Sequence, residues 1–137
     1  MNPQQILLVQ STFAQVAPIA DVASAIFYDE LFTRDPSLRP LFKDDITEQR
    51  RKLMMMLGMA VNGLSDWKAT SAAVRSLGER HVGYGVERSH YDTVGAALIA
   101  TLGKGLGEAF TPEVQDAWVA CYGIVSGEMV DAMEAAA

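Results

Sequence analysis

His81 is the residue whose type and setting most favour chemistry in this chain of 137 residues, which has only one other histidine, His90. His81 shares a helical stripe with Val74 and Leu77, because the spacings between them are three or four residues. An imidazole on an apolar face needs a polar partner, since an unpaired buried polar group costs roughly 2 kcal/mol or more. The partner could be a backbone carbonyl, a carboxylate or a metal ion. The pattern alone favours a hydrogen-bonded core histidine.

Protein side chains alone cannot complete a metal site around His81. Zinc and two-metal sites need three or four clustered histidine, cysteine or carboxylate ligands. The two histidines are nine residues apart, Cys121 is the only cysteine, and the two Glu-x-x-His motifs that a di-iron helical bundle uses are not both present. A metal at His81 must therefore bring most of its own ligands. Haem does so, because the porphyrin supplies four nitrogens and the protein needs one axial imidazole.

Other kinds of site receive little support. No Gly-x-Ser-x-Gly sequence is present, and Cys121 lies in an apolar helical run where a thiol is normally inert. The segment 103–107 resembles a phosphate loop, but it follows a predicted helix and lacks the Walker spacing. Met54, Met56 and Met59 have helical spacing, which favours deformable core packing over axial sulfur ligation.

Composition indicates a single domain spanning 1–137, because a chain of this length suits one hydrophobic core. The formal charge of −6 and the pI of about 4.8 argue against nucleic acid and against an anionic membrane surface as partners. The single cysteine favours a reducing compartment. We find no signal peptide and no stretch that approaches the roughly 20 apolar residues of a membrane span. A soluble cytoplasmic protein is expected.

The elements that must position His81 are all helices, because strand and hairpin signals are missing. We predict an all-α domain of about seven helices of unequal length, over 3–17, 19–33, 35–42, 45–63, 65–82, 88–109 and 111–134, with 65–82 forming one helix or two short ones. The boundary signals are Pro18, Asp35-Pro36, Asn62-Gly63, the glycines Gly83 and Gly85, and Thr111-Pro112-Glu113.

Five segments, in order along the chain, resemble bacterial globins. They are 27–42, 48–53, 77–86, 91–95 and 117–123, and they include Leu77-Gly-Glu-Arg-His81 followed by Tyr84-Gly-Val86. The resemblance covers nearly the whole chain, and it is closest to single-domain bacterial globins and to the globin domain of flavohaemoglobins. It implies a globin fold packed around a non-covalently bound haem b.

The resemblance also implies a role for individual residues. His81 would be the proximal axial ligand, Phe42 would pack flat on the porphyrin, and Tyr28 and Gln49 would face the sixth coordination position. Leu53 lies one turn, roughly 6 Å, beyond Gln49 and would line the same pocket. The remaining expected haem contacts are Tyr84, Val86, Tyr91 and Val94, and the candidate propionate partners are Lys52, Arg80 and His90.

The resemblance predicts a five-coordinate iron that binds O₂, CO or NO, because glutamine stands where a distal histidine could ligate and His90 is too near His81 to cross the haem. Tyrosine hydroxyl and glutamine amide can both donate hydrogen bonds to bound O₂. Each such bond stabilises it by roughly 1–3 kcal/mol. Two donors predict slow O₂ release.

Two functions follow from this pocket. The first is reversible O₂ binding for storage, delivery or sensing. The second is nitric oxide dioxygenation, for which this chain would need a separate reductase. Flavohaemoglobins place a tyrosine and a glutamate beside the proximal histidine; Tyr91 fits the tyrosine, but Met133 stands where the glutamate is expected, with Glu134 next to it. This departure weakens the dioxygenase hypothesis. The third hypothesis is a helical interaction domain without haem. It holds only if the resemblance to globins does not reflect a haem-binding function.

Overall fold

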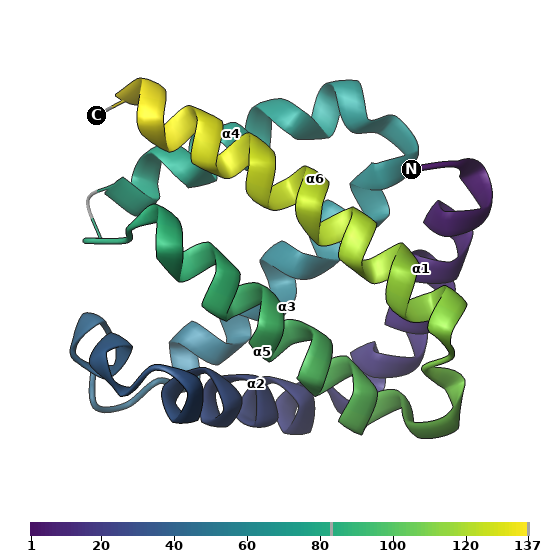
Figure 1. Ribbon diagram of the computed structural model, residues 1–137, viewed down its shortest axis with the longest axis horizontal. Helices are drawn as coiled ribbons and strands as arrows, with labels where there is room; N and C mark the ends of the chain where they lie inside the picture. Colours follow the sequence, from purple (N-terminus) through teal and green to yellow (C-terminus); the bar gives the residue numbers. More distant parts are fainter. Residues whose placement is uncertain (83, 137) are drawn as a thin grey trace.

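Helices account for nearly all of the described residues, 1–82 and 84–136, in this computed structural model (Figure 1). The α-helices are α1 (Pro3–Val16), α2 (Ala20–Arg34), α3 (Thr47–Asn62), α4 (Trp67–Val82), α5 (Arg88–Leu106) and α6 (Pro112–Ala136). Four 3₁₀ stretches join or extend them: η1 (Ala17–Ile19), η2 (Pro36–Leu41), η3 (Gly63–Asp66) and η4 (Gly107–Ala109). The prediction of an all-α fold is confirmed.

The capping signals explain where several of these helices begin. The Asp35 carboxylate accepts a hydrogen bond from the Ser37 backbone N–H, and Pro36 occupies the first position of η2. Thr111 Oγ1 accepts from the Val114 N–H at the start of α6, as predicted. Gly85 has φ +78°, a left-handed conformation that suits glycine in the turn after α4. The other glycine predicted in this turn, Gly83, lies outside the described residues.

The predicted boundaries differ from the structure in two ways. The short third helix is a 3₁₀ helix, because Pro40 inside it removes a backbone donor. The predicted helix 88–109 is divided into an α-helix and a 3₁₀ turn at its end, whereas 65–82, predicted as one helix or two short ones, consists of the end of η3 and the single α-helix α4. For 88–109 the division falls at Gly107, whose φ of +57° ends α5.

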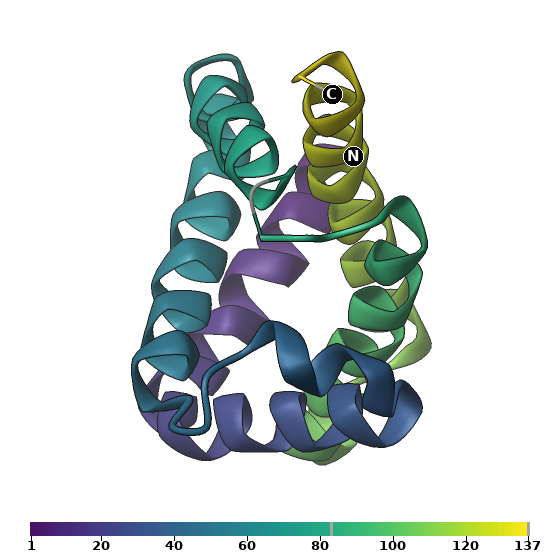
Figure 2. The ribbon, with the colours of Figure 1, turned by 90° about the vertical axis from the view of Figure 1, so that its left-hand side faces the viewer.

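α3 and α5 lie on different sides of the molecule (Figure 2), and α3 and α4 pack on different helices. α4 packs chiefly on α6, α2 packs on α5 and α3, and α1 packs on α6. Within the described ranges, α3 and α4 share few direct contacts although they follow one another along the chain. Figure 2 shows α3 on the opposite side of the molecule from α5, with the segment 36–42 crossing between them. His81 and Gln49 are therefore carried by helices with different packing partners.

A glycine allows a close contact between α4 and α6, which positions α4. A Cβ atom added at Gly78 would lie 2.4 Å from the carbonyl oxygen of Met129 on α6. Only a glycine permits the two backbones to approach so closely. This contact fixes the helix that ends in His81 and Val82.

The core consists of two clusters of buried apolar side chains. The larger one is built around Trp118, which is fully buried and donates its indole N–H to Thr12 Oγ1 at 2.9 Å. The smaller cluster lies between α4, α5 and α6 and consists of Val74, Tyr91, Met129 and Met133. Val74 was predicted to share a stripe with Leu77 and His81, and Leu77 packs against the same cluster.

The N-terminal part of the chain is more apolar than we expected. The helical run Pro3–Arg34 is long and apolar enough, by length and composition alone, to cross a membrane. Core packing accounts for one side of this run, because Val9, Phe13, Phe27 and Leu31 are buried in the larger cluster. The sequence-based expectation that no stretch approaches this length is therefore wrong as a statement about hydropathy.

Candidate functional site: one imidazole and a tyrosine–glutamine pair

His81 lies in the last turn of α4 with its ring half-buried. Its Nδ1 is 2.7 Å from the backbone carbonyl oxygen of Leu77, one turn earlier, so Nδ1 carries the hydrogen and donates it. This bond defines the tautomer and orients the ring. The other ring nitrogen, Nε2, then holds a lone pair, and among the described residues nothing hydrogen-bonds to it.

The protonation state of His81 suits a metal ligand. Burial lowers the pKa of the imidazole, and the nearby Arg80 cation lowers it further against the opposing effect of the Leu77 carbonyl. A lowered pKa keeps the ring neutral near pH 7, and a neutral imidazole is the form that ligates metals.

Tyr28 is the most buried of the predicted pocket residues. It lies on α2 with 3% of its surface exposed, and its ring forms edge contacts with Phe27 and Phe42 at centroid distances of 5.0 and 5.6 Å. Burial raises the pKa of the Tyr28 hydroxyl, with a smaller opposing effect from Gln49, so the group stays protonated at neutral pH. Packing holds the Tyr28 ring in place, so only its hydroxyl hydrogen can turn toward a hydrogen-bond acceptor.

Gln49 and Tyr28 meet although they are 21 residues apart. The Gln49 amide nitrogen donates to the Tyr28 hydroxyl oxygen at 3.2 Å, while the rest of Gln49 is exposed. Within the described part of the chain, the Tyr28 O–H hydrogen has no acceptor of its own. The two polar groups therefore act in series: the amide orients the hydroxyl, and the hydroxyl proton is available to a further acceptor.

Arg50 holds Gln49 beside Tyr28, and sequence reasoning missed it. Its guanidinium donates to Ser24 Oγ at 3.2 Å and to the backbone carbonyl of Asp21 at 2.6 Å, and it also pairs with the Asp21 carboxylate. These contacts fasten the start of α3 to α2. In the sequence, Arg50 is only a long cationic side chain next to Gln49. This position does not identify Ser24 or Asp21 as its partners.

The other predicted haem contacts occupy varied environments. Phe42, Leu53 and Val94 are half-buried and pack against the larger core cluster. Val86 packs against the smaller cluster. Tyr84 is 58% exposed, with its ring edge-on to His81 at 5.3 Å between centroids. These five apolar or aromatic side chains each keep some accessible surface, and two of them contact the polar groups: Phe42 contacts Tyr28, and Tyr84 contacts His81.

Tyr91 has a buried hydroxyl without a hydrogen-bond partner in the described structure. Burial raises the pKa of this hydroxyl. Its neighbours in the smaller cluster include Met129 and Met133, whose thioether sulfurs are weak acceptors. Glu134, the carboxylate next in sequence, is largely exposed and pairs with Arg88 at 2.9 Å. Met133, expected from the sequence at the flavohaemoglobin glutamate position, is thus buried in this cluster.

The remaining candidates take structural roles or stay untested. His90 accepts a hydrogen bond from the Glu87 N–H and so caps α5. Cys121 is buried, and burial raises the pKa of its thiol to about 12, as expected for an inert core cysteine. Lys52 and Arg80 are exposed, as a propionate partner must be, and their role stays a prediction.

The donor set fits a haem better than a bare metal ion. Within the described ranges, no three histidine, cysteine or carboxylate groups lie close enough to hold a metal ion. One neutral imidazole with an unpaired Nε2, and one buried hydroxyl with an uncommitted proton, are what a porphyrin iron and its gas ligand require. The half-buried Phe42, Leu53 and Val94 add apolar surface for a macrocycle.

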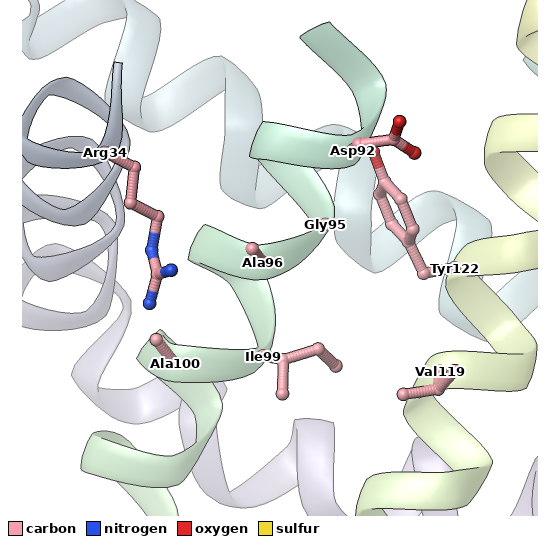
Figure 3. Close-up of a pocket in the computed structure, with 8 residues that line it drawn as sticks. All are labelled: Arg34, Asp92, Gly95, Ala96, Ile99, Ala100, Val119 and Tyr122. Atoms are coloured by element: carbon pink, nitrogen blue, oxygen red, sulfur yellow. The ribbon is translucent and has the colours of Figure 1, made fainter. Parts of the chain in front are cut away.

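A separate groove runs along the outside of α5 and has no part in this site (Figure 3). Its lining includes Arg34, Asp92 and Tyr122 but none of Tyr28, Gln49 or His81.

Comparison with known proteins agrees with the geometry. The family model for globins matches residues 25–129. A flavohaemoprotein of Bordetella pertussis is 29% identical over 126 residues, covering 90% of this chain. The chain spans 31% of the length of that relative.

Solved structures show the same fold. A bacterial globin from Campylobacter jejuni superposes with a TM-score of 0.87 at 23% identity, covering 98% of this chain and 97% of its own. A flavohaemoglobin from Malassezia yamatoensis with bound FAD and haem gives a TM-score of 0.82 at 18% identity, covering 98% of this chain and 37% of its own. At these identities the likeness establishes the fold.

Proposed function

The chain belongs to the globin family, and we propose that it binds O₂ reversibly, and also CO and NO, at a haem b iron that takes His81 as its one protein ligand. The observation that carries the proposal is the state of His81: a neutral ring, oriented through Nδ1, with Nε2 unpaired within the described structure. The proposal includes a role in oxygen storage, delivery or sensing. It also includes a cytoplasmic location, supported by the lone buried cysteine and by the charge of −6.

Haem supplies an iron with an open coordination position for a diatomic gas. The Leu77 carbonyl sets the direction of the His81 ring and keeps hydrogen off Nε2. A neutral carbonyl accepts a weaker hydrogen bond from Nδ1–H than a carboxylate does. The Nε2 lone pair therefore keeps the basicity of an ordinary neutral imidazole.

Tyr28 supplies the hydrogen bond to the gas. Its raised pKa keeps the proton on the hydroxyl, and its buried ring cannot swing away without disturbing Phe27 and Phe42. Gln49 acts mainly through Tyr28, because its amide already donates to the hydroxyl oxygen. The expectation of two parallel donors therefore becomes one donor with a supporting group.

Stopped-flow measurement of O₂ dissociation tests this pocket. We expect Tyr28→Phe to release O₂ about 10 to 100 times faster, because a bond of roughly 1–3 kcal/mol is lost. Gln49→Ala should have a smaller effect, about 2 to 10 times, because Tyr28 retains its own proton. Gln15→Ala on the exposed face of α1 is the control and should leave the rate unchanged. Equal rates in wild type and Tyr28→Phe would contradict the assignment.

Nitric oxide dioxygenation is the second candidate, favoured by the identity with a flavohaemoprotein. It requires an electron donor in each turnover. The arrangement around Tyr91 disfavours it, because Met133 occupies the place of a carboxylate and Glu134 pairs with Arg88 instead. Sustained NO consumption with a reductase and NADH would support this candidate, whereas a single stoichiometric burst would support the carrier.

A further inference from the structure

The segment 43–46 connects η2 to α3, and it therefore connects two parts of the expected haem pocket (Figure 2). Phe42 follows η2 and is expected to pack on the porphyrin. Gln49 lies in the first turn of α3 and supports Tyr28. The structure describes all of 43–46 and places none of these residues in a helix. The position of the segment must therefore depend on contacts other than helical hydrogen bonds.

Arg39 supplies these contacts through its guanidinium group. Nη1 donates to the carbonyl oxygens of Phe42 at 3.3 Å and Lys43 at 2.8 Å, and Nη2 donates to that of Asp44 at 2.9 Å. In residues 1–82 and 84–136, these three carbonyls accept no other hydrogen bond, and no ion pair includes Arg39. A guanidinium can serve several acceptors at once because its donors lie in a rigid planar fork.

The same guanidinium lies over an aromatic ring that reaches the gas site. Its central carbon is 5.2 Å from the centre of the Phe32 ring, within the range of a cation–π contact. The Phe32 ring contacts the Phe42 ring edge-on at 5.4 Å between centroids and the Tyr28 ring at 5.9 Å. Arg39 thus holds Phe42 in two ways, through its backbone carbonyl and through a neighbouring ring.

We propose that Arg39 is a positioning residue, which holds Phe42 and the segment 43–46 in place and so retains the haem. This inference rests on the proposed function, because it concerns the same haem. One bond from His81 and packing by side chains such as Phe42 are the contacts assigned to the haem. If Arg39 is lost, three carbonyls must turn to water, and the segment can move away together with Phe42. The pocket then opens on this side, and haem escapes faster.

An effect of charge at a helix end is the alternative explanation, because Arg39 lies in the last turn of η2. The two explanations differ in what they predict for Arg39→Lys. A lysine keeps the positive charge, so a simple charge effect would be fully retained. An ammonium group lacks the planar fork and cannot reach all three carbonyls in the same way, so the positioning role would be retained only in part.

Trypsin cleavage after Lys43 measures the opening of the segment in the full chain, with and without haem. Trypsin does not cut before proline, and Pro40 follows Arg39, so substitution of Arg39 removes no cleavage site. We expect Arg39→Gln to speed cleavage after Lys43 at least about tenfold, because three hydrogen bonds to a charged donor are lost. Cleavage after Lys104, within α5, should be unchanged, because the opening is local. Arg39→Lys should give an intermediate rate.

Transfer of haem from the loaded protein to an excess of a haem-binding acceptor protein measures retention. We expect Arg39→Gln to lose haem at least about tenfold faster than wild type, and Arg39→Lys to lie between them. Arg34→Gln is the matched control, because it removes an arginine of α2 that pairs with Glu30 and lies outside the gas site. It should change neither the haem loss nor the cleavage after Lys43.

Four results would overturn the proposal. Equal cleavage after Lys43 in wild type and Arg39→Gln would show that Arg39 does not hold the segment, and full recovery in Arg39→Lys would show a simple charge effect. Equal acceleration after Lys43 and Lys104 would indicate global unfolding. Faster cleavage after Lys43 with unchanged haem loss would remove the role in retention. A wild type that takes up no haem would overturn the proposed function and the retention role together, whereas the cleavage rates decide separately whether Arg39 holds the segment.

Discussion

Three tyrosines illustrate how differently one residue type is used in this molecule. The Tyr28 hydroxyl accepts from Gln49, and the Tyr122 hydroxyl donates to the Tyr91 carbonyl at 2.6 Å. The Tyr91 hydroxyl, in contrast, is buried without a partner in the described structure. An unsatisfied buried hydroxyl costs about 1–3 kcal/mol, whereas a satisfied one stabilises the fold by about 1 kcal/mol. The two neighbouring tyrosines should therefore respond in opposite ways to loss of the hydroxyl.

We predict that Tyr91→Phe raises the free energy of unfolding of the apoprotein by about 1 kcal/mol, while Tyr122→Phe lowers it by about the same amount. Urea denaturation of the two variants measures both effects, and each is the other's control. A loss of stability in Tyr91→Phe would mean that this hydroxyl has a partner.

The same substitution tests the redox argument. If Tyr91 does not influence His81, the midpoint potential of the haem-loaded protein should be unchanged in Tyr91→Phe. A marked shift of the potential would indicate a working relay to the imidazole and would restore the dioxygenase hypothesis.

At the scale of elements, helices and their caps were predictable because they depend on local sequence. Asp35-Pro36 and Thr111 act at short range, and the structure has them where the pattern indicates. The close approach of α4 and α6 at Gly78 was not predictable, because a glycine within a helical pattern does not reveal its neighbour. The contact between Gln49 and Tyr28 likewise depends on the docking of α3 on α2, and only the family resemblance linked the two residues beforehand.

Gly78→Ala should lower the free energy of unfolding by about 1–3 kcal/mol, although alanine is the better helix former. The added methyl would overlap the Met129 backbone, which cannot move aside as a flexible side chain can. Gly127→Ala is the control on α6, since nothing lies within 4 Å of its added Cβ. It should stabilise the protein by about 0.5–1 kcal/mol. Denaturant titration compares the two, and equal effects of the same sign would contradict the close approach.

At the scale of the whole molecule, the described residues include a half-buried imidazole with an unpaired Nε2, a buried tyrosine hydroxyl with an uncommitted proton, and a helical frame that supports both. The donors are carried by α2, α3 and α4, and α5 and α6 hold these helices in place through the core.

The absorption spectrum of the reduced, haem-loaded protein in the absence of gas tests the central claim most directly. We predict a Soret band typical of five-coordinate, high-spin ferrous haem, which shifts on addition of CO and is lost or altered in His81→Ala. Free imidazole should restore the wild-type spectrum to that variant, because it supplies the missing axial nitrogen. A protein that takes up no haem, a six-coordinate spectrum before gas is added, or an unaltered spectrum in His81→Ala would contradict the account.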